Sequence, residues 1–215
     1  VDLVVNEKVR ETFVARTKIV NAMRNFFNAQ GYLEVDTPVL QAIPGGASAR
    51  PFITHHNALD VPMYLRIANE LYLKRLIVGG FEGVYEFSRN FRNEGMDRTH
   101  NPEFTVMEIY VAYKDYYWMM DFTEAMLRYV CEHALGTTTV QFANRTIDFG
   151  KPFLRITMTD AIKQYTGFDI TGKSETELAD FAKSIGIEVN NTMGKGKLID
   201  EIFGAKCEGQ FIQPT

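Results

Sequence analysis

Residues 84–112 read VYEFSRNFRNEGMDRTHNPEFTVMEIYVA, and this stretch decides the fold. Val84–Arg92 and Glu103–Ala112 are rich in β-branched and aromatic residues, whereas the segment 93–102 between them is polar. The pattern predicts two strands joined by a loop. Because alternate residues of a strand lie on opposite faces, pairing in the simplest register sorts the side chains into an odd-numbered and an even-numbered set. The odd-numbered set is mostly apolar and is expected to cover the core: Tyr85, Phe87, Arg89, Phe91, Thr105, Met107, Ile109 and Val111.

The even-numbered set has a different chemistry. Besides Asn90 and Val106, it contains Glu86, Ser88, Arg92, Phe104, Glu108 and Tyr110. In most hairpins such a face is simply the solvated side of a two-layer domain. Here the large aromatic side chains of Phe104 and Tyr110 are unfavourable on a solvent-exposed face. The loop adds the polar residues Glu94, His100 and Asn101. An arginine, an aromatic ring and several carboxylates on one face suit a polyanion with a planar base, together with a cationic second ligand. A binding site is therefore favoured.

Helical patterns flank these strands in the sequence. The expected helices are Glu7–Gln30, Asn69–Val78 and Asp115–Leu135, each followed by glycine. Between the first two, Tyr32–Leu40 is expected to be extended, because Pro38 lacks a backbone donor and biases Thr37 away from helix. These elements predict a mixed α+β core.

The C-terminal part has a different character. A β-rich stretch, Val140–Ile156, is followed by short helices separated by glycines, expected at Thr159–Thr166, Ser174–Ile185 and Lys195–Ala205. We expect a small helical subdomain beyond residue 156.

The composition excludes several classes of protein. Hydrophobic residues make up 46% and charged residues 23% of the chain, the balance of a folded globular protein. No apolar run approaches the ~20 residues that cross a bilayer, so no membrane partner is expected. The net charge of −4 argues against nucleic-acid binding by bulk charge. Cys131 and Cys207 form no CxxC pair, which favours reduced thiols and a cytoplasmic location.

Four segments resemble those of one enzyme family. Phe91–Gly95 and Thr99–Tyr110 closely resemble motif 2 of the class II aminoacyl-tRNA synthetases, with bacterial lysyl-tRNA synthetases the best match. Gly31–Leu40 resembles motif 1, which forms the dimer interface in the family. Pro44–Phe52 and Tyr64–Leu71 resemble its lysine-pocket segments.

The resemblance covers residues 1–156 strongly and implies the family's catalytic core, an antiparallel sheet flanked by helices. Residues 157–215 resemble the helical insertion that follows motif 2, with the start of the return to the core. Function is implied too: ATP-dependent activation of L-lysine to lysyl-adenylate and transfer to tRNA(Lys), in a homodimer.

The resemblance also implies roles for the nucleotide-binding residues. Arg92 would be the catalytic residue, binding the α-phosphate of ATP and stabilising charge as the lysine carboxylate attacks it. Phe104 would stack on adenine, and Glu94 would accept a hydrogen bond from its exocyclic amine. His100 and Asn101 would lie near the phosphates and the base.

Further residues are implied for the amino acid. Glu70 would hold the α-ammonium of lysine, and Glu108 with Tyr110 would contact its side-chain ammonium. Gly46 would allow the backbone to approach the substrate closely. Aspartyl- and asparaginyl-type enzymes bind anionic or neutral side chains, so the acidic Glu108 argues against them.

Departures from the family pattern are also visible. Motif 3, with its second catalytic arginine, does not occur, nor does the anticodon-binding barrel that precedes motif 1. The carboxylates that hold Mg²⁺ with ATP lie in the motif 3 region, so no metal ligands are expected in this chain. Thr99 stands where bacterial relatives more usually have arginine, with Arg98 one place before it. We therefore expect a fragment of the catalytic domain that folds and associates but does not ligate.

Alternative functions remain open from the sequence. A synthetase-like paralogue that ligates an amino acid to a protein lysine would also lack the barrel. A non-catalytic synthetase-derived dimerisation module is another reading. Residues 167–174, GFDITGKS, fit the P-loop pattern, but the preceding segment is helical, and Ser174 with Glu177 makes a capping box instead.

Overall fold

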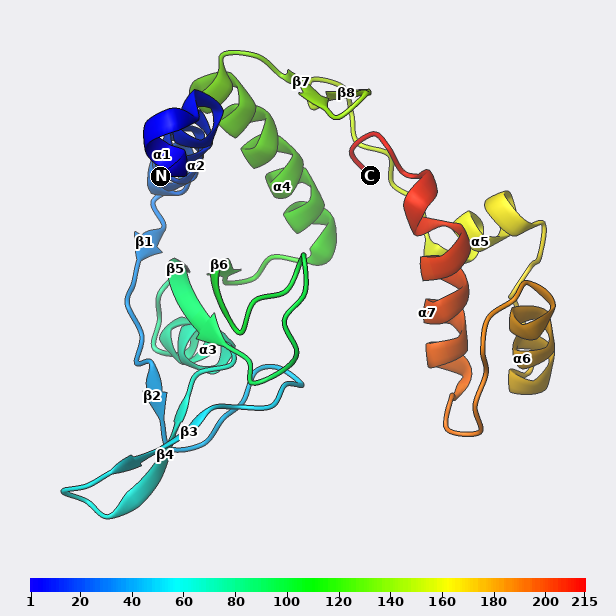
Figure 1. Cartoon of the computed structure of the whole chain (residues 1–215), viewed down its shortest axis with the longest axis horizontal. Coiled ribbons are helices and arrows are strands. Elements are labelled where there is room, and N and C mark those ends of the chain that lie inside the picture. Colours follow the sequence, from blue (N-terminus) through cyan, green and yellow to red (C-terminus); the bar gives the residue numbers. More distant parts are fainter. The chain divides into compact units, whose positions relative to one another are not determined.

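The computed structural model describes residues 1–215 and divides into two units, Val1–Ala134 and Leu135–Thr215 (Figure 1). The division falls earlier in the chain than the boundary after residue 156 expected from the sequence, because the hairpin that follows residue 135 groups with the second unit. The assignment of residues 1–156 to the catalytic core and of residues 157–215 to a helical insertion stays a prediction.

The centre of the first unit is the hairpin anticipated from the sequence. Strands β5 (Gly83–Phe91) and β6 (Glu103–Val111) pair antiparallel, with Gly83 opposite Val111 and Phe91 opposite Glu103. Strand β1 (Leu33–Glu34) joins the other edge of β5 in parallel, giving the order β1-β5-β6. The simplest register is confirmed.

Two helices cover the odd-numbered face of this sheet. Helices α2 (Glu7–Ala29) and α4 (Tyr116–Val130) pack on each other (Figure 1). Asp115 starts α4 by accepting a hydrogen bond from the Trp118 amide at 2.8 Å, and a π-helical turn, η1 (Cys131–Leu135), ends it. The ring of Phe27 lies 4.8 Å from that of Tyr85, and both side chains are fully buried.

The core of this unit joins both helices to the odd face. Its buried members are Ala22, Phe27, Tyr85, Phe122, Met126, Val130 and Ala134, with Phe87, Met107 and Ile109 packed against them. The prediction that the odd-numbered side chains cover the core is confirmed for Tyr85, Phe87, Met107 and Ile109, whereas Arg89 and Thr105 are exposed near the loop end of the hairpin. Along α2 the residues that pack in this core begin at Ile19, whereas Phe13, nearer the start of the helix, is 59% exposed.

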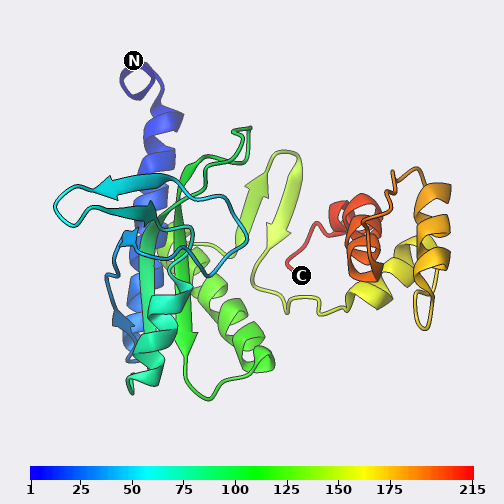
Figure 2. The same ribbon diagram turned by 90° about the horizontal axis from the view of Figure 1, so that it is seen from below.

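The opposite face of the sheet carries α3 (Glu70–Val78), which packs against β5 and β6. A second sheet has the order β2-β4-β3 and is formed by β2 (Leu40–Gln41), β3 (Ile53–His56) and β4 (Val61–Leu65). The β3–β4 hairpin extends away from the rest of the unit (Figure 2). A short helix, α1 (Asp2–Val5), precedes α2. None of the helices combines the length and the apolar character needed to cross a membrane.

The second unit contains one hairpin and the three short helices expected from the sequence. Strands β7 (Thr139–Phe142) and β8 (Arg145–Asp148) pair antiparallel, and the β-rich stretch expected up to Ile156 ends at Asp148. Helices α5 (Met158–Thr166), α6 (Glu175–Ser184) and α7 (Lys195–Lys206) follow, with a 3₁₀ turn, η2 (Glu208–Gln210). They share a core whose buried members include Ile162, Leu178, Leu198 and Ile202.

The fold class expected from the sequence is confirmed as a mixed α and β architecture, with small, mainly antiparallel sheets and flanking helices. The one parallel pair, β1 with β5, arises because the extended segment after α2 runs back along the sheet edge. This arrangement leaves the even-numbered face of β5 and β6 beneath α3 and the loop before it.

Candidate active site

The even-numbered face of the β5–β6 hairpin carries the predicted site residues Phe104, Glu108 and Tyr110, with Arg92 directly after β5. Glu86 lies directly opposite Glu108, and Asn90 lies directly opposite Phe104. Directly opposed residues of an antiparallel pair have Cβ atoms about 4.5–5.5 Å apart, so their side chains interact. The face is not a solvated surface: Glu86, Ser88 and Asn90 are all buried.

Arg92 and Phe104 lie together at one end of this face. The Arg92 guanidinium carbon is 5.2 Å from the centre of the Phe104 ring, a cation–π contact. The Arg92 amide donates to the carbonyl of Pro102 at 2.8 Å, which anchors the base of the loop. The Nε atom of Arg92 is buried and has no hydrogen-bond partner. A guanidinium held by a ring and left with an unused donor is suited to bind an anion.

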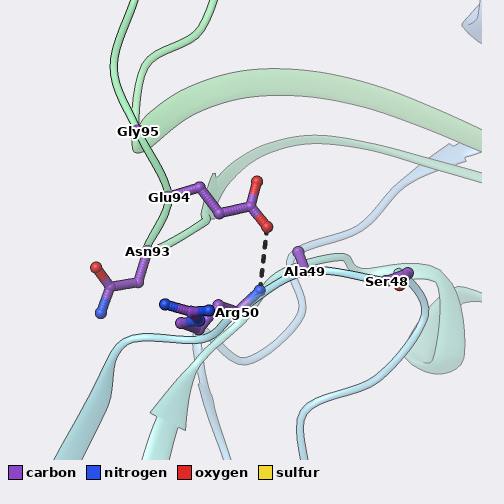
Figure 3. A pocket seen from close by; sticks show the side chains of 6 residues that line it. All are labelled: Ser48, Ala49, Arg50, Asn93, Glu94 and Gly95. Carbon is purple, nitrogen blue, oxygen red and sulfur yellow. Dashed lines mark hydrogen bonds between the residues drawn. The ribbon is translucent and has the colours of Figure 1, made fainter. Parts of the chain in front are cut away.

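Glu94 borders a cavity of about 490 Å³ beside the loop. Its lining residues are Ser48, Ala49, Arg50, Asn93, Glu94 and Gly95. Figure 3 shows the two chain segments facing each other, with the Glu94 carboxylate directed at the backbone of Arg50. The Arg50 amide donates to Glu94 Oε1 at 3.2 Å, and the Asn93 amide donates to the Arg50 carbonyl at 2.7 Å. Two segments predicted separately to bind substrate thus meet at one cavity.

The loop between β5 and β6 is organised by Asp97. Its Oδ1 accepts hydrogen bonds from the amides of Thr99 at 2.7 Å and His100 at 2.8 Å, and the His100 ring lies 2.9 Å from the same carboxylate. These donors hold the pKa of Asp97 well below its usual value. Thr99 therefore closes the turn rather than extending from it. His100 and Asn101 are both exposed on this loop.

Carboxylates gather at the other end of the face. Glu108 is half-buried, and burial raises its pKa, with nearby Glu70 and Glu86 adding to the effect. Tyr110 donates a hydrogen bond to Glu108 Oε2 at 3.3 Å, and burial raises the pKa of its phenol. Glu70 begins α3 and forms an ion pair with the exposed Lys74. A group of carboxylates in a partly buried place is suited to a cationic ligand.

Gly46 lies against Glu70, one of these carboxylates. Its φ of +88° is in the left-handed region, and a Cβ there would come 3.0 Å from the Glu70 Cβ and 3.1 Å from the Ala68 Cβ. Any side chain at position 46 would therefore be strained and would press on Glu70. The glycine keeps the loop close to the start of α3.

A buried polar network behind these carboxylates was not predicted. Arg66 and Glu86 form an ion pair of 2.8 Å with side chains only 3% and 2% exposed. Glu86 also accepts from the Thr37 hydroxyl at 2.7 Å and from Asn69 Nδ2 at 3.0 Å. The Oδ1 atom of Asn69 is buried without a partner. Glu86 had a sequence signal in its place in the even-numbered set, and Thr37, Arg66 and Asn69 lie in segments that resemble those of the family, but neither signal indicated that these side chains bond to one another.

Two further features of the sequence have a local structural explanation. Gly167 ends α5 in the left-handed conformation and Ser174 caps α6, so the segment 167–174 joins two helices and lacks the strand that a P-loop requires. His55 in β3 lies 3.0 Å from Asp60 in the β3–β4 turn. The two form a pair, and no group of three or more potential metal-binding side chains is present.

Comparison with known proteins identifies the class. The family model described as tRNA synthetases class II (D, K and N) matches residues 1–193, and the chain belongs to this family. Relatives named lysine–tRNA ligase are 72% identical over 214 residues in Christiangramia forsetii and 69% identical over 215 residues in Porphyromonas gingivalis. A relative of the same name in Azobacteroides pseudotrichonymphae is 64% identical over 215 residues. These alignments cover all of this chain but only 38%, 37% and 43% of the respective relatives.

Proposed function

We propose that the chain is part of a lysine–tRNA ligase and carries the lysine- and ATP-binding face of its catalytic domain. The observation that carries the proposal is the pairing of two chemistries on one sheet face. Arg92 is stacked with Phe104 at one end, and half-buried Glu108 lies beside Glu70 at the other. An anion with a planar base suits the first, and a substrate with two ammonium groups suits the second. The names of the relatives agree.

The proposed reaction joins lysine to ATP between these two ends. A carboxylate oxygen of lysine attacks the α-phosphorus of ATP, and the bond to the bridging oxygen of the β-phosphate breaks. Lysyl-adenylate forms and pyrophosphate leaves. Arg92 binds the α-phosphate and stabilises the charge that develops there, a task suited to its planar fork of donors.

The neighbouring residues position the two substrates. Phe104 stacks on adenine, Glu94 accepts from its exocyclic amine, and His100 and Asn101 approach the phosphates and the base. Support for this arrangement comes from the cavity, which joins Glu94 to the segment around Arg50.

Lysine lies at the carboxylate end. Glu70 binds its α-ammonium, and Glu108 with Tyr110 binds its side-chain ammonium. Gly46 admits the substrate close to the backbone, which its left-handed conformation and contact with Glu70 support.

The remaining parts of the proposal concern the whole enzyme. Mg²⁺ accompanies ATP, the lysyl group passes to tRNA(Lys), and the enzyme is a cytoplasmic homodimer. The exposed apolar side chains of Leu33, Val39 and Leu40 in the segment resembling motif 1 support the dimer.

The test is amino-acid-dependent exchange of pyrophosphate into ATP by the full-length enzyme that contains this chain, run over all amino acids. Maximal exchange with lysine, followed by charging of tRNA(Lys), is expected. A maximum with aspartate or asparagine would overturn the assignment.

A further inference from the structure

Three carboxylates interact on the even-numbered face. Glu86 and Glu108 are directly opposed across β5 and β6, and Glu70 begins the helix that packs on both strands. The negative charges of Glu70 and Glu86 both act to raise the pKa of Glu108. Like charges in a partly buried place repel, and one of them tends to take up a proton. Ionised carboxylates therefore need a nearby cation.

Arg66 supplies a buried cation at this place. Its Nη1 donates to Glu86 Oε1 at 2.8 Å and to the Thr37 carbonyl at 2.9 Å, and its Nε donates to the Arg89 carbonyl at 2.8 Å. Arg66 is therefore fixed by backbone acceptors on two segments as well as by Glu86. Its charge also acts to lower the pKa of Glu108. Lys74, which pairs with Glu70, is more than half exposed, and such surface pairs are readily exchanged for another cation.

We propose that Arg66, by neutralising Glu86, is a specificity-determining positioning residue of the amino-acid pocket. The inference rests on the proposed function. The neutral Arg66–Glu86 pair leaves Glu70 and Glu108 as the two carboxylates available to the two ammonium groups of lysine. Without Glu86, the fixed charge of Arg66 would repel a substrate ammonium. Without Arg66, the uncompensated charge of Glu86 would favour protonation of Glu108, which lies directly opposite it.

The test is a double-mutant cycle of Glu86→Gln and Arg66→Gln in the full-length enzyme. The KM values for lysine and for ATP are measured by pyrophosphate exchange between about pH 5 and pH 8. The charged or titratable groups that face Glu108 are Tyr110, Glu86, Glu70 and Arg66. The acidic limb of the pH profile for lysine binding reports the protonation of Glu108.

Opposite changes are expected from the two single variants. Glu86→Gln leaves Arg66 uncompensated, so the KM for lysine rises roughly ten-fold or more and the acidic limb moves to lower pH. Arg66→Gln leaves Glu86 uncompensated, so the acidic limb moves to higher pH. The double variant restores a neutral pair, so both quantities return toward those of the unaltered enzyme. The KM for ATP changes no more than about three-fold in any of them, because Arg92 and Phe104 are untouched.

A purely structural role for the pair would give another result. It predicts loss of thermal stability with both KM values affected, and no opposite movement of the acidic limbs. Acidic limbs that stay in place or move the same way would overturn the inference. If Arg66→Gln does not fold, the Glu86→Gln variant alone tests the inference: an acidic limb that moves to lower pH supports it, and one that stays in place or moves to higher pH overturns it.

A matched control is Arg128→Gln, which breaks an arginine–glutamate pair on α4 outside the site. It should leave the lysine KM and the acidic limb unchanged. Exchange by the unaltered enzyme is measured first: failure with lysine would refute the proposed function, whereas normal exchange with unshifted variants would refute only the role of Arg66.

Discussion

Substitution of Arg92 by lysine is the sharpest test of the nucleotide end of the site. The change keeps a positive charge but removes the planar fork that can contact two phosphate oxygens at once. It also weakens the stacking on Phe104, whose ring centre lies 5.2 Å from the guanidinium. We expect adenylate formation to fall by roughly 100-fold, with the KM for lysine changed far less.

The magnitude follows from the two contacts. A charge-assisted hydrogen bond contributes about 1.5–3 kcal/mol, and a cation–π contact at a partly exposed position contributes about 0.5–1 kcal/mol. Loss of one such bond and part of the stacking gives about 2–3 kcal/mol. Each 1.36 kcal/mol is about a factor of ten in rate, which leads to a decrease of roughly 30- to 150-fold.

The assay is single-turnover formation of lysyl-adenylate by the full-length enzyme at saturating ATP and lysine. Arg89→Lys is the matched control, because Arg89 lies three residues before Arg92, near the end of β5 and on its odd-numbered face, where it is exposed and paired with Glu103. The control should keep adenylation close to normal. Near-normal adenylation by Arg92→Lys itself would refute the catalytic role of Arg92.

Three further predictions concern the lysine end, the core and the association of subunits. Glu108→Gln should weaken lysine binding by about 2 kcal/mol or more, measured by calorimetry, because a substrate ammonium loses its charged partner. The same variant should not lower the thermal stability at pH 7. Because the pKa of Glu108 is raised in the folded protein, its protonation stabilises the fold only as the pH falls through that pKa, and Gln removes this pH dependence. Phe27→Ala should reduce the free energy of unfolding by about 3–5 kcal/mol in denaturant titrations, since the ring is fully buried against Tyr85 and Phe122; a loss below 1 kcal/mol would contradict its central place in the core. Leu40→Glu should shift the full-length enzyme toward monomer in sedimentation experiments, because Leu40 is 47% exposed in the segment proposed to form the interface, and an unchanged dimer would argue for another surface.

Strand periodicity predicted the central hairpin correctly. Alternation with a period of two is a local property, so it sorted the side chains of β5 and β6 onto the correct faces before any contact was known. It also placed Arg92 and Phe104 on one face, and the structure brings them into contact. The helix ends at Gly31 and Gly136 were also predictable from local sequence, because glycine readily adopts the positive φ that commonly follows a helix, and both residues have a positive φ.

The buried network could not be predicted from local patterns. Thr37 and Glu86 are 49 residues apart, and Arg66 carries no sign that it is buried, because arginine is usually exposed. The exposure of Phe13 is not predictable from local patterns either, because amphipathic spacing shows that a helix has an apolar stripe but not how far along the helix that stripe is covered. The β7–β8 hairpin ends at Asp148 rather than Ile156 because Gly150 and Pro152 interrupt the extended pattern.

The separation in sequence of the Glu86 partners has a consequence for how the first unit folds. The bonds of Glu86 to Thr37, Arg66 and Asn69 close chain loops of 49, 20 and 17 residues, and none of them lies within one helix or hairpin. Such contacts become favourable only after the entropy of loop closure has been overcome by the assembled sheet. We therefore expect this network to form after the folding transition state. Weakening it through Thr37→Val should speed unfolding while leaving the refolding rate nearly unchanged.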